Sequence, residues 1–305
     1  MNDILFQLSP IFAFFLIGCL LKASRLAERS HGDFLLRVVF YVTLPLLILT
    51  TLPNAQLNAG KALLPLANIT VNLLCLGAAL LAMRSLALPR PTQGALLMNT
   101  MITNNAFMFP FILSIYGESG FADAIIYDFG NALMVATITF ITAFKYSDAA
   151  HDNFTMLKRM AKSPLFWALC AGIVFSVTGT ALPEWVSSVS KPLAQMTAPL
   201  ILIALGIHFS ISPGRLKLVA LALTVRMALG LVFGLAFATL AGLEGQTFTV
   251  IALCSAAPIG FTALTFTSMA RLDMELTTAA VSLSILTGLV YIPLLILLFG
   301  FLGFE

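Results

Sequence analysis

The residues best suited to binding chemistry lie in two long apolar stretches, 99–117 and 249–270, each of which contains a proline. The polar and helix-breaking residues in these stretches are Asn104, Asn105, Pro110, Ser255, Pro258 and Thr262. A proline cannot donate a helix hydrogen bond and clashes with the preceding turn, so backbone groups near Ala106 and Cys254 should be left free. In a membrane, free backbone groups persist only where protein or a water-filled cavity covers them. The pattern predicts a polar site between broken helices, whose N-termini attract anions; the simpler alternative is two kinked helices.

Arg226 is a basic residue deep inside another apolar stretch, 217–243. It follows Lys217 by nine residues, which places it ~14 Å into a hydrocarbon core of about 30 Å. A charge there costs at least ~2.5 kcal/mol and must be paired or solvated. Two uses compete: an anchor for a substrate carboxylate, and a structural lock to Asp128 or to freed carbonyls of the helix that contains Pro258.

Asp128 and Asn131 are the candidates for coupling transport to an ion. Asp128 follows Phe121 by seven residues, roughly 10 Å below the expected outer membrane surface. Desolvation favours the neutral carboxyl at that depth, so Asp128 could carry a proton; it could equally point outward or pair with Arg226. We expect no bound cofactor and no metal site, and the candidate coupling ions are H⁺ and Na⁺.

The composition shows which elements must position these residues. The chain has 305 residues, of which 60% are hydrophobic and 10% are charged, too few charges for the surface of a soluble domain. We predict an all-α membrane protein with ten spans of ~20 residues or more. The spans are approximately 4–21, 34–53, 62–83, 91–117, 122–144, 164–183, 189–210, 217–243, 245–270 and 276–301.

Basic residues predict the orientation of these spans. With the N-terminus outside, thirteen of the sixteen Lys and Arg residues fall in or beside cytoplasmic loops and two, Lys61 and Lys191, fall outside. Both termini are then extracytoplasmic. The formal net charge of +3 follows from this topology, and we expect membrane lipid but no nucleic acid as a partner.

Two pairs of similar segments share an offset of 154 residues. SPIFAFFLIG (9–18) matches SPLFWALCAG (163–172), and TLPLLIL (43–49) matches TAPLILI (197–203). We therefore predict two inverted five-helix repeats, 1–145 and 164–305, joined by a cytoplasmic linker at 146–163, with the broken fourth and ninth helices crossing at the membrane midplane. Inverted repeats are typical of secondary transporters. The same offset relates Asn72 to Arg226, so both are predicted to face the crossing.

Three segments resemble the auxin efflux carrier family, which includes plant PIN-FORMED auxin exporters and bacterial malonate or malate carriers. They are FLIGCLLKASRL (15–26), FYVTLPLLILTTL (40–52) and AAPIGFTALTFTSMARLDMELTTAAVSLS (256–284). The resemblance implies that helices 1, 2, 6 and 7 form a scaffold that dimerises, and that helices 3–5 and 8–10 form a mobile transport domain with substrate at the helix 4–9 crossing. The chain departs from the family pattern at Thr103, Met108 and Thr262, which bears on the substrate.

Together these features predict a secondary transporter in the bacterial inner membrane. It would carry a small organic anion, a mono- or dicarboxylate, by elevator-like alternating access. One alternative is a sodium-coupled organic-anion symporter of the bile-acid type, with Ser255, Thr262 and Asn104 as oxygen ligands; another is a membrane sensor without transport. P-loop, Rossmann, HExxH and GxSxG motifs are absent from the sequence, so we expect neither an ATP-driven pump nor an enzyme.

Overall fold

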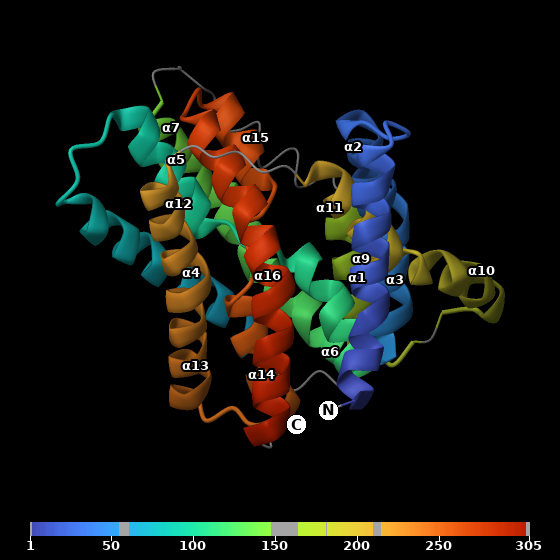
Figure 1. The fold of residues 1–305 in the computed structure, drawn as a ribbon. Coiled ribbons are helices and arrows are strands. Elements are labelled where there is room, and N and C mark those ends of the chain that lie inside the picture. Colours follow the sequence, from blue (N-terminus) through green and yellow to red (C-terminus); the bar gives the residue numbers. More distant parts are fainter. Residues whose placement is uncertain (1, 55–60, 148–163, 181, 210–214, 303–305) are drawn as a thin grey trace. The chain divides into compact units, whose positions relative to one another are not determined.

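The computed structural model describes residues 2–54, 61–147, 164–180, 182–209 and 215–302, and these residues are almost entirely helical (Figure 1). Most of the predicted linker, residues 148–163, lies outside the described part of the chain. In chain order the α-helices are α1 (Asn2–Ala23), α2 (Arg29–Val38), α3 (Leu44–Thr51), α4 (Leu63–Met83), α5 (Arg90–Met101), α6 (Asn105–Met134), α7 (Phe140–Lys145), α9 (Pro164–Thr178), α10 (Glu184–Gln195), α11 (Thr197–His208), α12 (Leu216–Leu223), α13 (Gly230–Leu240), α14 (Gly245–Ser255), α15 (Thr262–Met269) and α16 (Met274–Leu302).

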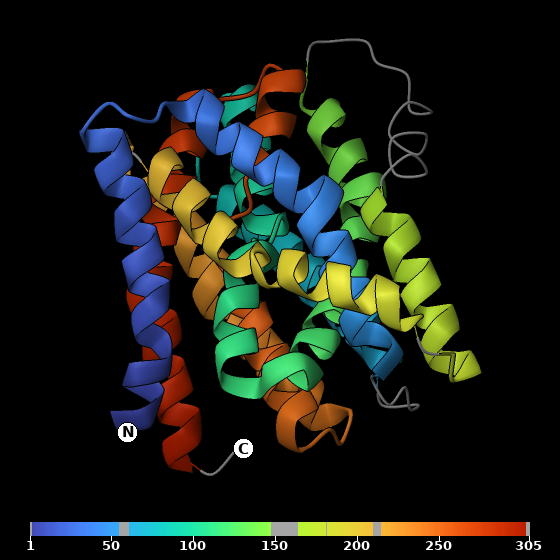
Figure 2. The same ribbon diagram turned by 90° about the vertical axis from the view of Figure 1, so that its right-hand side faces the viewer.

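Several of these helices continue into one another through short irregular turns. The π-helical turns η1 (Val39–Thr43), η3 (Val135–Thr139) and η4 (Thr224–Leu229) join α2 to α3, α6 to α7 and α12 to α13, and the 3₁₀ turn η2 (Leu52–Asn54) follows α3. In Figure 2 the lighter of the two blue helices runs without a break from α2 through α3, and the darker one, which starts at the N label, is α1. Turns of this kind change the direction of side chains without exposing backbone groups, which suits long helices in lipid.

Within the described residues, six helical runs are long and apolar enough to cross a membrane. They are Arg29–Thr51, Leu63–Met83, Asn105–Lys145, Glu184–His208, Leu216–Leu240 and Met274–Phe301. Shorter apolar helices cover Ser9–Ala23, Trp167–Thr178 and Gly245–Ser255. Large apolar side chains stay uncovered on these helices, with Leu240 and Phe301 89% and 88% exposed, as expected of surfaces that face lipid. The all-helical membrane fold is confirmed, whereas ten spans, their inverted repeat and their orientation stay predictions.

The chain forms two compact units, each built from segments of both halves of the sequence. Unit 1 contains Met1–Lys61, Phe109–Ile125 and Leu157–Phe209; unit 2 contains Ala62–Met108, Ile126–Met156 and Ser210–Glu305. Unit 1 therefore also includes 109–125, a segment that the family resemblance assigns to the transport domain.

Unit 1 is held together by close packing of α1 against α11 (Figure 1). Gly18 and Gly206 face each other so closely that a Cβ at Gly206 would lie 2.2 Å from the Phe15 carbonyl oxygen. Small residues allow such backbone approach, which is the usual way in which helices pack in lipid. In the same unit the Lys61 Nζ pairs with the fully buried Asp123 carboxylate at 2.9 Å.

Unit 2 holds the interrupted helices and is the unit that positions the candidate site. Within it α4 packs against α5 and α13, α13 packs against α14, and α5 contacts α15 and α16. Helix α6 contributes both of its ends to this unit, because its backbone turns at Gly117, where φ is +61° and ψ is −156°. A positive φ costs glycine little, so Gly117 is suited to this turn.

Candidate functional site

The candidate site is the place in unit 2 where two helices are interrupted side by side. The first interruption separates α5, which ends at Met101, from α6, which begins at Asn105; the second separates α14, which ends at Ser255, from α15, which begins at Thr262. Thr103 and Ile259 form an antiparallel β-bridge. In it the Asn104 N–H donates to the Pro258 carbonyl at 2.8 Å, and the Gly260 N–H donates to the Ile102 carbonyl at 3.0 Å. The two broken helices thus supply each other with the backbone partners that lipid cannot provide.

Local sequence explains why each helix stops where it does. Pro258 lacks an N–H and disfavours helical geometry at Ala257, so α14 ends just before it. The Asn104 side chain caps α6, since its Oδ1 accepts a hydrogen bond from the Phe107 N–H at 3.1 Å. The Ile259 N–H, which has no place in a helix here, donates to the Ser284 hydroxyl of α16 at 3.1 Å.

Pro110 does not mark the first interruption. Helix α6 runs through Pro110, and the non-helical residues are 102–104, ahead of the proline. The expectation of two broken helices is met, but the break in the first of them is set by the Asn104 cap and by pairing with residues 258–260. Sequence patterns reveal a proline more readily than such pairing, which explains the difference.

Arg226 lies on the π-helical turn η4 and is completely buried. Its Nη1 donates to Asn72 Oδ1 at 2.7 Å and to the Thr100 carbonyl at 3.3 Å, and its Nη2 donates to the Ser255 carbonyl at 2.9 Å. Thr100 and Ser255 lie at the C-terminal ends of α5 and α14, where unsatisfied carbonyls carry partial negative charge. One guanidinium therefore serves the ends of both half-helices.

The Arg226 geometry decides between the partners that the sequence suggested. A carbonyl at the end of α14 is a partner, as expected for a structural lock, and the Asn72 side chain is a further partner that was predicted only to face the crossing. Asp128 is not, because its carboxylate interacts with other side chains and no salt bridge joins it to an arginine in the described part of the chain.

Two glycines of α13, Gly230 and Gly234, allow α13 to pack closely against Ser255 of α14. A Cβ at Gly230 would lie 2.3 Å from the Ser255 carbonyl oxygen, and a Cβ at Gly234 would lie 2.4 Å from the Ser255 Oγ. The same Ser255 hydroxyl hydrogen-bonds the Tyr127 hydroxyl at 2.8 Å. The Ser255 side chain therefore bonds within the protein, and the residue is 0% exposed.

A second polar group surrounds Asp128. Its Oδ1 accepts hydrogen bonds from Asn105 Nδ2 at 2.6 Å and Asn131 Nδ2 at 3.0 Å. Asn105 Nδ2 also lies 3.4 Å from the Thr103 hydroxyl, in the first interruption. The Asp128 cluster, consisting of Asp128, Asn105 and Asn131, therefore touches the crossing directly. The side-chain oxygens of both asparagines are buried and have no hydrogen-bond partner in the described part of the chain.

Thr262 differs from the other predicted residues in being exposed, at the start of α15. Thr103 was noted in the sequence only as a departure from the family pattern, and three further residues were not predicted. These are Tyr127 and Ser284, which form the hydrogen bonds described above, and Asn99, which is fully buried, with neither side-chain amide atom bonded to a described residue. Each is a polar residue in a predicted apolar span, which was the available signal.

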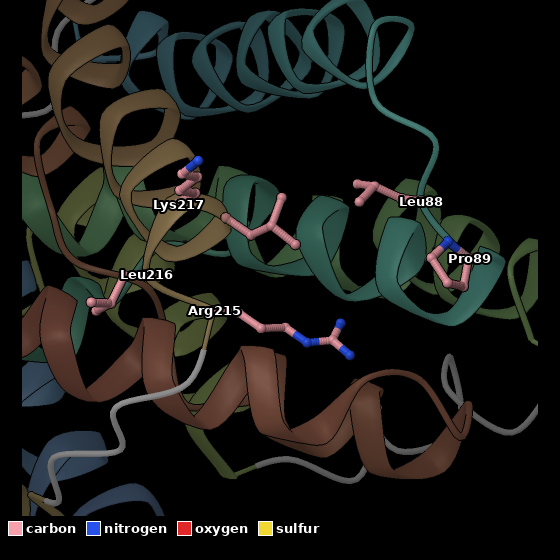
Figure 3. Close-up of a pocket in the computed structure, with 6 residues that line it drawn as sticks. Leu88, Pro89, Arg215, Leu216 and Lys217 are labelled. Atoms are coloured by element: carbon pink, nitrogen blue, oxygen red, sulfur yellow. The ribbon is translucent and has the colours of Figure 1, made fainter.

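A surface pocket of about 550 Å³ lies elsewhere in unit 2 (Figure 3). It is lined by Leu88, Pro89, Arg215, Leu216, Lys217 and Leu218. None of the predicted site residues lines it, so pocket volume does not identify the crossing as a site.

Arg215, beside this pocket, belongs to a polar contact that ties together the starts of three helices. Its guanidinium pairs with Asp273 Oδ2, which also accepts a hydrogen bond from the Thr92 hydroxyl at 2.8 Å. Asp273 Oδ1 accepts the Leu276 N–H at 3.1 Å and so caps α16. The cluster joins the starts of α5, α12 and α16.

We expect Asp273→Ala to lower the free energy of unfolding by about 1–2 kcal/mol, because a helix cap is lost together with a partly exposed ion pair. Thermal unfolding of the purified protein in detergent measures the change. Glu275→Gln, an exposed change in the same helix turn, is the matched control and should differ little from wild type. Equal melting of the Asp273→Ala and Glu275→Gln proteins would contradict the assigned role.

Known protein families include one whose sequence model matches this chain. The family model described as "Membrane transport protein", which represents the auxin efflux carrier family, matches residues 3–296. The chain belongs to this family. An uncharacterized transporter of Methanothermobacter thermautotrophicus is 27% identical over 291 residues, which cover 92% of this chain and 93% of that protein. An uncharacterized transporter of Methanocaldococcus jannaschii is 24% identical over 292 residues, with the same coverage.

Membership in the auxin efflux carrier family confirms the resemblance drawn from the sequence. The chain is an integral, multi-pass membrane transporter, and its family fits the expectation that it is not an enzyme. Family membership therefore favours transport over the alternative of a membrane sensor without transport.

Proposed function

We propose that this auxin efflux carrier family member is a secondary transporter of a small organic anion, a mono- or dicarboxylate, that binds at the crossing of the two interrupted helices. The observation that carries the proposal is the pairing of residues 102–104 with residues 258–260. Helices α6 and α15 both begin within three residues of this pairing, so their N-termini lie beside it. Helix N-termini present N–H groups and partial positive charge, which suits a carboxylate.

Two further features support an anion over a cation. Asn104 Nδ2 is buried at the crossing as a hydrogen-bond donor without a partner. Asp and Glu are absent from the two interrupted segments, 99–117 and 249–270. An Na⁺ site would need several oxygen ligands, and in the described residues the Ser255 hydroxyl is bonded to Tyr127 and Thr262 is exposed. The anion carrier is therefore favoured over the sodium symporter.

Alternating access would be elevator-like, with one unit moving substrate relative to the other. The support is that each compact unit draws on both halves of the chain, as inverted-repeat carriers require. Location in the bacterial inner membrane and dimerisation through helices 1, 2, 6 and 7 remain predictions from the topology and the family.

Exchange in proteoliposomes tests the proposal. Vesicles loaded with malonate, malate, lactate or indole acetate are diluted into the labelled form of the same compound, and protein-dependent exchange is recorded. We expect one or more carboxylates to exchange. Absence of exchange for all four, in protein that melts cooperatively, would contradict the proposed substrate class.

Two variants of Asn104 separate anion binding from helix capping. Asn104→Ser keeps an oxygen that can cap α6 but removes the unpartnered N–H donor, whereas Asn104→Asp keeps the cap and adds a negative charge. Loss of one hydrogen bond to a charged group costs about 1.5–3 kcal/mol, or roughly 10- to 100-fold in affinity. We expect weaker half-saturation for Asn104→Ser and a larger loss for Asn104→Asp. Unchanged half-saturation in both would contradict binding at Asn104.

A further inference from the structure

The Asp128 cluster is arranged around a carboxylate that has no basic partner among the residues that the structure describes. Helices α4 and α14 contact this part of α6, through Gly130 against Pro65 and through the hydrogen bond of Tyr127 to Ser255. Their titratable groups are single buried thiols, Cys75 on α4 and Cys254 on α14. Asp128 is partly buried on a long apolar helix, where a charge without a counter-ion is costly, so the site favours taking up a positive charge.

Two ionisable groups close to the cluster, Arg226 on η4 and Tyr127 on α6, already have partners within the protein, whereas Glu118, also on α6, is exposed. Arg226 binds Asn72 and the carbonyls of Thr100 and Ser255, and the Tyr127 hydroxyl is bonded to Ser255. Asp123, five residues earlier on α6, is paired with Lys61. Asp128 is therefore the titratable group of the cluster that is open to a change of charge.

The hydrogen bonds of the cluster fit an ionised carboxylate and also provide for a protonated one. Two amide N–H groups donate to Asp128 Oδ1, which suits negative charge. If Asp128 gains a proton, its O–H needs an acceptor. The two buried, unpartnered oxygens of Asn105 and Asn131 become such acceptors once either amide turns over.

Rotation of the Asn105 amide would change what the crossing offers to an anion. In the ionised state Asn105 Nδ2 is engaged by Asp128. In the protonated state Asn105 Oδ1 accepts a hydrogen bond from the carboxyl O–H, and Nδ2, no longer held by Asp128, becomes available as a donor at the start of α6. Protonation thus removes a negative charge near the crossing and adds an N–H donor to it. Both changes favour binding of an anion, and anion binding must favour protonation equally.

We propose that Asp128 is the proton-binding site of this carrier, and that Asn105 links its protonation to anion binding at the helix crossing. The proposal rests on the proposed function. In one cycle the Asp128 carboxylate and one proton form the neutral carboxyl on one side of the membrane, the anion binds, and both ligands leave on the other side, which restores the carboxylate. Na⁺ is disfavoured because the amide nitrogens, and not oxygens, face Asp128 Oδ1.

Proteoliposomes containing the full chain test the coupling with malonate as the first probe. An imposed gradient of about one pH unit, alkaline inside, with the membrane potential clamped by valinomycin and equal K⁺, should drive up to about tenfold accumulation for one coupled proton. In Asp128→Asn we expect no accumulation and malonate exchange that no longer depends on pH. Glu118→Gln, an exposed carboxylate change on the same helix, is the control and should behave like wild type.

A second variant keeps the test decisive if Asp128→Asn does not fold. Asp128→Glu retains a titrating carboxyl but displaces it by one methylene, so accumulation should persist with a shifted pH profile. Equal accumulation by wild type and Asp128→Asn, an Asp128→Glu profile identical to that of wild type, or exchange by wild type without response to the gradient would each overturn the proposal.

An infrared titration separates this proposal from the proposed function. The chain has 13 Asp and Glu residues, so the titration of Asp128 is read from the difference between the spectra of wild type and Asp128→Asn, both in lipid without added anion. This difference should contain a carboxyl C=O band that grows as pH falls. If no carboxylate in the panel is exchanged but the band is present, the proton site stands and the substrate class fails. If exchange is found but the band is absent, the proton site fails alone.

Discussion

Arg226→Met is expected to lower the free energy of unfolding by about 3–5 kcal/mol, because three buried acceptors lose their donor and each unsatisfied acceptor costs ~1–3 kcal/mol. The acceptors are Asn72 Oδ1 and the carbonyls of Thr100 and Ser255. Methionine fills much of the volume, so the loss of hydrogen bonds dominates over a cavity. Thermal unfolding in detergent without any substrate measures the effect, and transport of malonate should fall with it.

Conservative changes locate the cause of this destabilisation. Arg226→Lys keeps the charge but lacks the planar fork, so it should recover only part of the lost stability. Asn72→Ala removes one of the three acceptors and should cost less than Arg226→Met. If Arg226 were instead the anchor of a substrate carboxylate, Arg226→Met would melt like wild type and lose only its affinity for malonate.

Much of this arrangement was accessible from the sequence. The 154-residue offset predicted that Asn72 and Arg226 both face the crossing, and in the structure the two residues are hydrogen-bonded at 2.7 Å. The depth of Arg226 in an apolar stretch required buried partners, and the carbonyl groups beside Pro258 were among those named. The first inference follows from the internal repeat, and the second follows from the cost of a charge or a free carbonyl in lipid.

What could not be predicted depends on pairing between segments distant in the chain. Asn105 and Asp128 are 23 residues apart on α6 and meet because the helix turns at Gly117. Hydropathy shows an apolar stretch on either side of Gly117 but gives no angle between them. The position of the first interruption likewise depends on a bridge from Thr103 to Ile259, two residues separated by more than half the chain.

Gly260→Ala is expected to disrupt the crossing itself. A Cβ at this position would lie 2.7 Å from the Thr103 carbonyl oxygen and 2.9 Å from Ile102 Cγ2, and the first of these atoms is backbone that cannot turn aside. The bridge, in which the Gly260 N–H bonds the Ile102 carbonyl, must therefore open or shift. Overpacking of a well-packed interior costs about 1–3 kcal/mol. Because the shift falls on the proposed anion site, we expect malonate exchange to fall further than stability.

Gly77→Ala is the matched control for this change. Gly77 lies on α4 of the same unit, and a Cβ there would meet nothing within 4 Å. Alanine in place of glycine inside a helix stabilises by up to about 1 kcal/mol, so Gly77→Ala should melt at or above the wild-type temperature and transport normally. Gly288→Ala is a second variant that should disturb the crossing, since its Cβ would lie 2.6 Å from Pro258 Cγ. Normal exchange by both Gly260→Ala and Gly288→Ala would mean that the crossing is not where the anion binds.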